Sequence, residues 1–240
     1  MLLFISDLHL SAETPRIARR FEDLLAGPVR EADGLYILGD LFEYWAGDDD
    51  GADPFNARML GALRAATEAG TPIHFLAGNR DFLVGEGFAA ATGVTLLSDP
   101  YVLSVPAWQF VLSHGDALCT DDREYQAFRQ QVRNPEWQRG FLAQPLATRK
   151  QMIAAIRQRS EATKREKDAA IMDVNPGATE DFLRDYGYAT LIHGHTHRPA
   201  THDHIVDGIH CQRWVLSDWH EEAGEVLVWD GSALERRVLP

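Results

Sequence analysis

The chain lacks the residues that would build a disulfide framework or a cysteine metal site. It has two cysteines in 240 residues, Cys119 and Cys211, and they form no metal-binding motif. No apolar run approaches the ~18 residues needed to cross a bilayer. The apolar stretch at residues 2–5 is too short for the core of a signal peptide. We therefore expect a cytosolic chain with reduced thiols, whose contact with any membrane is peripheral.

Basic residues are also scarce, and they are unevenly spread. The sequence has 23 Lys and Arg against 36 Asp and Glu, a formal net charge of −13, which disfavours a generic nucleic-acid binder. Residues 123–167 are the exception, with eleven basic side chains against four acidic ones, so that this segment is +7 and the remainder −20. The contrast indicates an anionic ligand or an anionic surface, with a solvated helical face as the alternative.

What the sequence does contain is a set of potential metal-binding side chains in five separated blocks, four of which directly follow a short apolar run. The blocks are Asp7-Leu-His9, Gly39-Asp40, Gly78-Asn79-Arg80-Asp81, His114-Gly-Asp116 and Gly194-His195-Thr-His197. Two divalent cations about 3.5–4 Å apart need a bridging carboxylate, oxygen donors, several imidazoles and positions left open for water and substrate. The five blocks in this order predict a two-metal phosphoesterase.

Each block has an expected place in such a centre. Asp7 and His9 are two residues apart at a strand end, so both can hold one metal, and His197 can close that site. Asp40 is the natural bridge to a second metal. The mixture of oxygen and imidazole donors suits Mn, Fe or Zn better than Ca or Mg. The expected metal ligands are Asp7, His9, Asp40, Asn79, His114, His195 and His197.

The hydrophobic pattern predicts an α/β domain. Strands are expected at residues 2–6, 35–38, 73–76, 110–113 and 190–193, with helices at 16–30 and 55–69. This alternation implies a βαβ sheet whose carboxyl strand ends line the binding crevice. Runs at 212–216, 225–229 and 236–239 look like an antiparallel set that completes a second sheet. Residues 123–172 read as helices interrupted near Asn134-Pro135 and Gln144-Pro145, followed by a helix at 176–186.

We expect a core domain of residues 1–122 and 171–240 and a helical insertion, or lid, of residues 123–170. If residues 150–167 form one helix, Arg157, Ser160, Lys164 and Lys167 lie on one stripe that can face phosphates, beside apolar positions. That combination suits a ligand with a nucleoside diphosphate and acyl chains. Packing of the helices on each other explains the apolar residues equally well.

The order of the five blocks resembles the calcineurin-like metallophosphoesterase superfamily, whose pattern runs D-x-H, G-D, G-N-[HR]-[DE], a strand-end His and G-H-x-H. The resemblance implies a four-layer α/β/β/α sandwich of two sheets flanked by helices, with a helical lid. Within the superfamily the chain is most similar to the pyrophosphohydrolases of lipid A biosynthesis, through residues 5–10, 38–43, 77–82, 112–116, 172–175 and 193–197.

That resemblance implies a manganese-dependent cleavage of UDP-2,3-diacylglucosamine to UMP and 2,3-diacylglucosamine 1-phosphate. A hydroxide bridging two Mn²⁺ ions would attack the α-phosphorus. The enzyme would lie peripherally on the cytoplasmic face of the inner membrane, with no nucleic acid and no protein partner. The catalytic residues would be Asp40, Asn79, Arg80, His114 and His195. The expected substrate-binding residues are Asn79, Arg80, Asp122, Tyr125, Arg157, Ser160, Lys164, Lys167 and His195.

Three other functions compete with this one. A phosphodiesterase or nuclease could use the same metal core, although the acidic body argues against long nucleic acids. A non-catalytic scaffold would be expected to lack ligands, and none is missing from this sequence. A Ser/Thr protein phosphatase fits the short chain and the basic stripe less well.

Several further residues have an expected role outside the ligand set. Asp81 and Asp116 should orient the ligands by hydrogen bonding, and His74 should be a core or sheet residue. His193 sits within a predicted strand, which argues against ligation. His202-Asp-His204 is expected to be a polar turn, and Asp48-Asp49-Asp50 a solvated loop. Trp45 could either pack in the core or line the substrate cleft.

Overall fold

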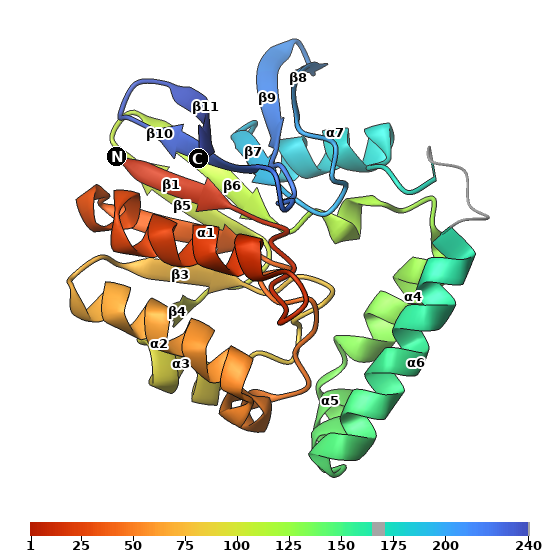
Figure 1. Cartoon of the computed structure of the whole chain (residues 1–240). Helices are drawn as coiled ribbons and strands as arrows, with labels where there is room; N and C mark the ends of the chain where they lie inside the picture. Colours follow the sequence, from red (N-terminus) through yellow and green to blue (C-terminus); the bar gives the residue numbers. More distant parts are fainter. Residues whose placement is uncertain (165–170, 240) are drawn as a thin grey trace.

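Two mixed sheets lie face to face and carry helices on their outer faces (Figure 1). The computed structural model describes residues 1–164 and 171–239, with side chains for all of these except residues 159–164. One sheet has the order β11-β10-β1-β2-β3-β4 and the other β5-β6-β7-β9-β8. This is the four-layer arrangement predicted from the sequence, so the fold class is confirmed.

The first sheet is parallel at its centre. β1 (Leu2–Ile5), β2 (Gly34–Leu38), β3 (Ile73–Leu76) and the short β4 (Thr95–Leu96) run parallel, and α1 (Pro15–Ala26), α2 (Pro54–Glu68) and α3 (Glu86–Thr92) connect them. β10 (Gly224–Trp229) joins the far edge of β1 antiparallel and pairs with β11 (Leu234–Leu239). The prediction that all the C-terminal runs belong to the second sheet was wrong, because β10 is buried on both faces and fits beside β1.

The second sheet holds β5 (Tyr101–Val105), β6 (Trp108–Ser113), β7 (Thr190–His193), β8 (Ala200–Val206) and β9 (Ile209–Val215). β6, β7 and β9 are parallel, while β5 and β8 are antiparallel edge strands. His202 and His204 lie within β8, so the polar turn expected there is wrong. Their half-buried side chains alternate with exposed ones, which is the period of a strand at a sheet edge. The sequence patterns also missed α3, β4 and β5.

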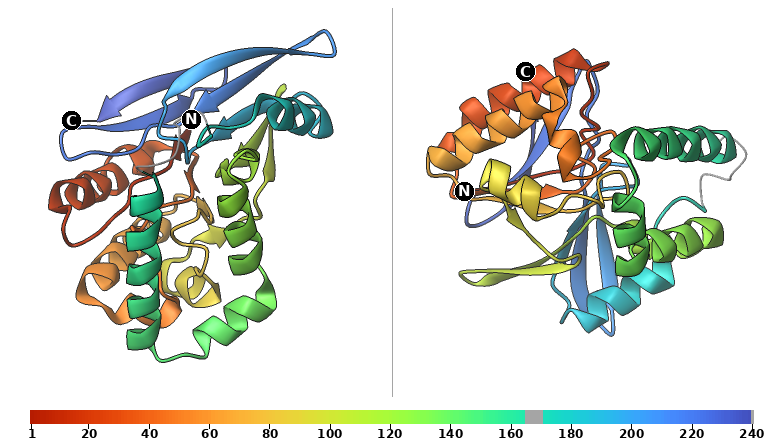
Figure 2. Two further views of the ribbon diagram at one scale, coloured as in Figure 1. Left: turned by 90° about the vertical axis from the view of Figure 1, so that its right-hand side faces the viewer. Right: turned by 90° about the horizontal axis from the view of Figure 1, so that it is seen from below.

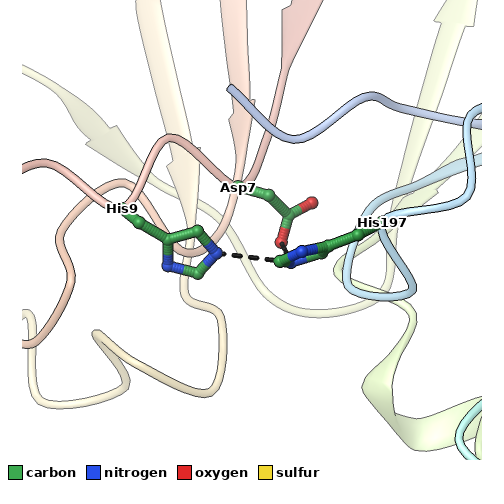
Figure 3. A group of neighbouring side chains, drawn as sticks. All are labelled: Asp7, His9 and His197. Atoms are coloured by element: carbon green, nitrogen blue, oxygen red, sulfur yellow. Dashed lines mark hydrogen bonds and ion pairs between the residues drawn. The ribbon is translucent and has the colours of Figure 1, made fainter. Parts of the chain in front are cut away.

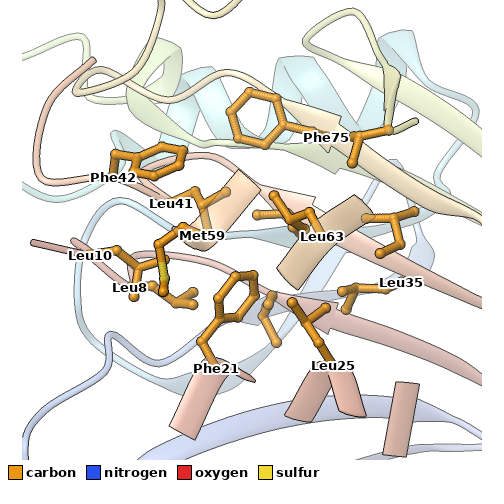
Figure 4. Close-up of a cluster of buried hydrophobic side chains, with 14 of the residues drawn as sticks. Leu8, Leu10, Phe21, Leu25, Leu35, Leu41, Phe42, Met59, Leu63 and Phe75 are labelled. Atoms are coloured by element: carbon orange, nitrogen blue, oxygen red, sulfur yellow. The ribbon is translucent and has the colours of Figure 1, made fainter. Parts of the chain in front are cut away.

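Alternation along the strands sorts side chains into separate cores. In β1, Leu3 and Ile5 face α1 and α2, whereas Phe4 faces the second sheet. Figure 4 shows the cluster under the helices, where Phe21 of α1 and Leu63 of α2 pack toward the strands. α7 (Pro176–Asp185) covers the outer face of the second sheet through a third cluster.

The basic segment forms three helices beside the two sheets, α4 (Arg123–Val132), α5 (Pro135–Leu142) and α6 (Leu146–Lys164). They stand to one side of the sandwich in Figure 2. The breaks fall at Asn134-Pro135 and Gln144-Pro145, as predicted, because Asn134 caps α5 by accepting hydrogen bonds from Glu136 N and Trp137 N. Within residues 1–164 and 171–239, no helix has the length and apolar character needed to cross a membrane.

Buried ion pairs fix the start of α6 to the first sheet's loops. Arg149 is 2% exposed and donates to Ala46 O and to Asp49. Lys150 Nζ lies 2.6 Å from a carboxylate oxygen of the fully buried Asp50. The prediction of a solvated loop at residues 48–50 is therefore wrong. The segment is a 3-10 helix, η2 (Asp48–Ala52), and it contacts the start of α6.

Candidate metal centre

Strand ends from both sheets meet at one point, and polar side chains leave them there. Asp7 and His9 follow β1, Asp40 follows β2, and Asn79 follows β3, all in the first sheet. His114 follows β6, and His195 and His197 follow β7, in the second sheet. Carboxyl ends of neighbouring parallel strands share an edge, so the packing of the two sheets brings all seven predicted ligands into one cluster.

Asp7, His9 and His197 form one group of potential ligands (Figure 3), with donor atoms within 4.8 Å of one another. The Nε2 atoms of His9 and His197 are 3.3 Å apart, and His197 Nε2 lies 3.5 Å from Asp7 Oδ1. Asp7 is fully buried, yet this Oδ1 accepts no hydrogen bond. A buried carboxylate oxygen without a donor is costly, and two imidazole nitrogens beside it make a fitting place for a cation.

A second group joins Asp7 to Asp40 and His114. One oxygen of Asp40 lies 3.7 Å from His114 Nε2 and the other 4.0 Å from His9 Nε2. Asp40 thus presents an oxygen to each group, which is the geometry that a bridging carboxylate needs. Asp7 also belongs to both groups.

Asn79 completes the second group. Its Oδ1 lies 2.9 Å from His114 Nε2 and 2.8 Å from His195 Nδ1. An amide oxygen between two imidazole nitrogens is a mixed donor set that suits a first-row divalent metal. Carboxylates, an amide and four imidazoles within reach of one another therefore fit divalent cations.

Electrostatics within the cluster favour the charged forms of its residues. Burial raises the pKa of Asp7, but the contact with His197 and the charges of His114, His197 and His9 hold it well below its usual range. Burial lowers the pKa of His114, and the charges of Asp40, Asp7 and Asp116 outweigh it and raise the pKa to about 9. Without a cation, the proton held by His114 supplies positive charge beside these carboxylates.

The buried Asp81 holds two ligand-bearing loops together. Its carboxylate accepts hydrogen bonds from Leu41 N at 2.7 Å and Gly78 N at 2.8 Å, and from Asp40 N at 3.3 Å. Burial, and then the charge of Asp40, raise the pKa of Asp81 to about 6. Asp81 thus positions Asp40 and Asn79 through the backbone. The carboxylate of Asp116 instead accepts hydrogen bonds from α4.

Glycines allow the strand ends to approach this closely. A Cβ on Gly78 would overlap both Oδ1 and the backbone nitrogen of Asp40. A Cβ on Gly194 would overlap Ser6 Oγ and Asp7 Oδ2. These are the glycines of the G-N-R-D and G-H-T-H blocks, and each lies against a ligand carboxylate.

Five of the seven predicted ligands have positive φ angles. They are Asp7 at 57°, His9 at 49°, Asp40 at 52°, His195 at 69° and His197 at 53°. Non-glycine residues seldom adopt this region, which costs on the order of 1–3 kcal/mol each. The turns after β1, β2 and β7 therefore hold their ligands in strained backbone conformations.

Two carboxylates that the ligand motifs did not single out support the imidazoles. Glu43 Oε2 lies 3.2 Å from His9 Nδ1, and Asp218 Oδ2 lies 3.2 Å from His197 Nδ1. A carboxylate on the far nitrogen of a metal-binding imidazole fixes the orientation of the ring. Glu43 lies in the same motif as Asp40, which was a usable signal, whereas nothing in the sequence around Asp218 distinguishes it.

Glu43 also connects the cluster to α6. Arg80 Nη1 lies 3.5 Å from Glu43 Oε1, and Arg157 of α6 donates a hydrogen bond to the same oxygen. Burial raises the pKa of Glu43, but His9, Arg80 and Arg157 lower it below its usual value. Two arginines that were predicted to bind substrate thus converge on one carboxylate beside His9.

The other predicted substrate residues lie on α4 and α6. Tyr125 donates a hydrogen bond to Asp116 at 2.6 Å, and its ring centroid is 5.6 Å from that of His195. Asp122 caps α4 by accepting from Tyr125 N at 3.0 Å. The side chains of Ser160 and Lys164, and the whole of Lys167, lie outside the described part of the chain.

Three residues considered at the sequence level stand apart from the cluster. His193 is buried, shares a hydrogen bond with Gly194 O at 2.8 Å, and faces Arg213 at 3.1 Å. Burial, and then Arg213, lower the pKa of His193 to about 3. His74 stacks on Tyr36 in the sheet. Trp45 is 1% exposed and packs edge-on against Phe88, so it belongs to the core.

Comparison with known proteins agrees with this geometry. Residues 1–199 match the profile of the calcineurin-like phosphoesterase family, and the chain belongs to that family. Three similar proteins are each named UDP-2,3-diacylglucosamine hydrolase. The Aromatoleum aromaticum protein is 56% identical over 230 residues, which are 96% of this chain and 93% of that protein. The Chromohalobacter salexigens protein is 49% identical, covering 95% and 93%, and the Chromobacterium violaceum protein 47%, covering 99% and 97%.

Proposed function

We propose that this chain hydrolyses the pyrophosphate bond of UDP-2,3-diacylglucosamine, releasing UMP and 2,3-diacylglucosamine 1-phosphate for lipid A biosynthesis. The observation that carries the proposal is the cluster of seven donors in a chain that is 47–56% identical to proteins named for this substrate. Similarity over more than nine-tenths of each chain includes the helical segment as well as the metal centre.

The cluster would hold two divalent cations, with Mn²⁺ as the favoured ion and Asp40 as the bridge. Asp7, His9 and His197 would hold the first, and Asn79, His114 and His195 the second. Bound cations would lower the pKa of a water and neutralise phosphate charge, which is the chemistry that cleavage of a phosphoanhydride requires.

The protein's own groups then position the substrate. The guanidinium of Arg80 lies at the edge of the cluster, 20% exposed, where it can donate two parallel hydrogen bonds to phosphate oxygens. Arg157 approaches the same place from α6. Stabilising the charge that spreads over the phosphate oxygens in the transition state is the largest contribution expected of such residues.

We assign the core to residues 1–122 and 171–240, and the lid to residues 123–170. Leu142 of α5 and Met152 and Ile156 of α6 are 37–42% exposed, so apolar side chains remain uncovered in this segment. Exposed apolar surface beside arginines suits acyl chains attached to a phosphorylated sugar. The same features support a peripheral position on the cytoplasmic face of the inner membrane.

The test is release of UMP from UDP-2,3-diacylglucosamine by the purified protein after removal of metals and addition of Mn²⁺, Mg²⁺, Zn²⁺ or Ca²⁺ separately. Bis-p-nitrophenyl phosphate and a single-stranded oligonucleotide serve as comparison substrates. Selective UMP release with Mn²⁺ supports the proposal. Turnover of the simple diester alone would retain the metal chemistry and reject the substrate.

A further inference from the structure

A cavity of about 530 Å³ opens directly beside the metal centre. His9 and Glu43, which lie at the metal centre, form part of its lining. Its walls come from the segment between Ser11 and Ile17, where α1 begins, and from residues 219–222 in the loop before β10, with Arg157 of α6 opposite them. α4 approaches the centre elsewhere, through Tyr125 against His195. The cavity is therefore a separate compartment that shares His9 with the centre.

The lining combines an apolar base with small polar groups. Ile17 and Trp219 are buried, at 4% and 3% exposed, and Trp219 Nε1 is already bonded to Glu225 O at 3.1 Å, so the indole offers only hydrocarbon. The hydroxyls of Ser11 and Thr14 are half-buried and 3.2 Å apart. Pockets of about 300–1,000 Å³ with an apolar lining and a few polar groups are typical of small-molecule sites.

The charge of the cavity restricts its occupant. Among the described residues, the lining of the cavity has four carboxylates, those of Glu13, Glu43, Glu221 and Glu222, and one guanidinium, that of Arg157. Such a field repels a phosphate lodged deep in the cavity, while carboxylates and hydroxyls readily accept hydrogen bonds from neutral sugar hydroxyls, as acidic residues do with ribose in dinucleotide sites. Phosphate is expected only near Glu43, where Arg157 and Arg80 converge.

The lid offers the complementary surface. Leu142, Met152 and Ile156 leave apolar side chains exposed on α5 and α6, which suit acyl chains and offer nothing to a nucleoside. A substrate whose pyrophosphate lies at the metals has two unlike ends, one polar and aromatic and one with acyl chains. The cavity has polar groups over an apolar base, and the lid has exposed apolar side chains, so each surface matches one end of the substrate.

We propose that the cavity between the start of α1 and the loop before β10 binds the nucleoside half of a nucleoside diphosphate substrate, with the pyrimidine over Ile17 and Trp219 and the ribose hydroxyls near Ser11 and Thr14. The proposal rests on the proposed function, since that function supplies the nucleoside. It adds a site that selects the leaving nucleotide independently of the acyl chains.

The two reaction products test the assignment separately, because only UMP carries the nucleoside. Thr14→Trp fills the cavity, whereas Ala12→Trp puts the same side chain on an exposed neighbouring residue outside it. We expect Thr14→Trp to weaken UMP binding at least ~10-fold, equivalent to about 1.4 kcal/mol. Binding of 2,3-diacylglucosamine 1-phosphate should stay within about twofold, and Ala12→Trp should change neither constant. Inhibition constants and calorimetry with Mn²⁺ present give both values.

A second variant, which adds no bulk, distinguishes loss of the binding site from misfolding. Ser11→Ala with Thr14→Ala removes the two hydroxyls without adding bulk, and should weaken UMP and uridine severalfold at an unchanged melting temperature. Unchanged UMP binding in both variants, or equal weakening of both products, would overturn the nucleoside site. If the wild-type protein released no UMP from the lipid substrate, the proposed function would fail first, and that result is read before any variant is made.

Discussion

Asp218 Oδ2 lies 3.2 Å from Nδ1 of His197, while the other nitrogen of that ring faces Asp7 at 3.5 Å. Burial lowers the pKa of His197, and its contacts with Asp218 and Asp7 raise it to about 10. Asp218 is half-buried, contacts no other predicted ligand, and comes from the loop before β10. A ligand on the second sheet is thus oriented by a carboxylate more than twenty residues further along the chain.

Asp218→Asn should lower metal affinity or activity 10–100-fold, because the imidazole of His197 loses the carboxylate that fixes its orientation. Metal titration of the stripped protein and kcat/KM with saturating Mn²⁺ measure the two effects. Asp203→Asn is the matched control, since Asp203 contacts His210 at 2.8 Å on an exposed part of β8 and β9. Equal behaviour of the two variants would show that Asp218 has no orienting role.

Asp40→Ala should abolish activity and reduce the bound metal, because Asp40 presents oxygens to both groups of ligands. The lost interaction is worth several kcal/mol, so kcat/KM should fall by ~10³-fold or more. Metal content by elemental analysis and activity are measured on the same sample. Wild-type metal content together with wild-type activity would refute the site.

Glu43→Gln should loosen the connection between α6 and the metal centre, because Arg157 and Arg80 lose the charge on which they converge. We expect KM to rise severalfold, and amide exchange in α6 to become faster. Arg157→Ala should weaken substrate binding with metal content intact. A double-mutant cycle of Glu43→Gln and Arg157→Ala should give a coupling free energy of about 0.5–3 kcal/mol, calculated from the KM values. Glu22→Gln, in an exposed pair with Arg58, is the control, and strict additivity would contradict the connection.

Gly78→Ala should impair both stability and metal binding, since the added methyl overlaps Asp40. Gly61→Ala makes the same change in the middle of α2, where a Cβ meets nothing within 4 Å. That variant should instead gain roughly 0.5–1 kcal/mol from the better helix former. Thermal unfolding and metal titration of the pair separate a close backbone approach from a general effect of alanine.

His193 should make the protein less stable in acid. Its pKa is about 3 in the folded protein against an ordinary 6.5, so the unfolded chain binds the extra proton, and stability present above pH 6.5 is lost as the pH falls toward 3. Each unit of pKa difference corresponds to about 1.4 kcal/mol. We therefore expect the free energy of unfolding of the metal-free protein to depend less on pH in His193→Asn than in the unaltered chain. The comparison is made between pH 6.5 and 3. Parallel curves would mean that His193 binds a proton in the folded protein too.

The ligand set could be proposed from sequence because four of the five blocks sit directly after an apolar run, and parallel strands share an edge at their carboxyl ends. Asp7 and His197 are 190 residues apart in sequence, and the packing of the two sheets brings them together. The supporting residue Asp218 could not be proposed in the same way. Asp218 enters through the loop before β10, and the pattern of β10 does not say which sheet it joins.

Short elements and tertiary contacts could not be predicted from the sequence, for a related reason. β4 has two residues and α3 seven, too few for a hydrophobic period to show. Asp50 is charged and follows two other aspartates, so the sequence suggests solvent, and only the tertiary contact with Lys150 explains its complete burial. The local hydrophobic pattern predicted most of the strands, whereas it gives no information on ion pairs between residues far apart in sequence.

The positive φ angles at Asp7, His9, Asp40, His195 and His197 have an evolutionary consequence. Glycine would relieve the strain at each of these turns, which offsets the conformational entropy that glycine adds to the unfolded chain. A lineage that used the fold only as a scaffold would be free to replace these residues by glycine. This chain has glycine at none of the five positions, so it keeps the ligand side chains together with the strained turns.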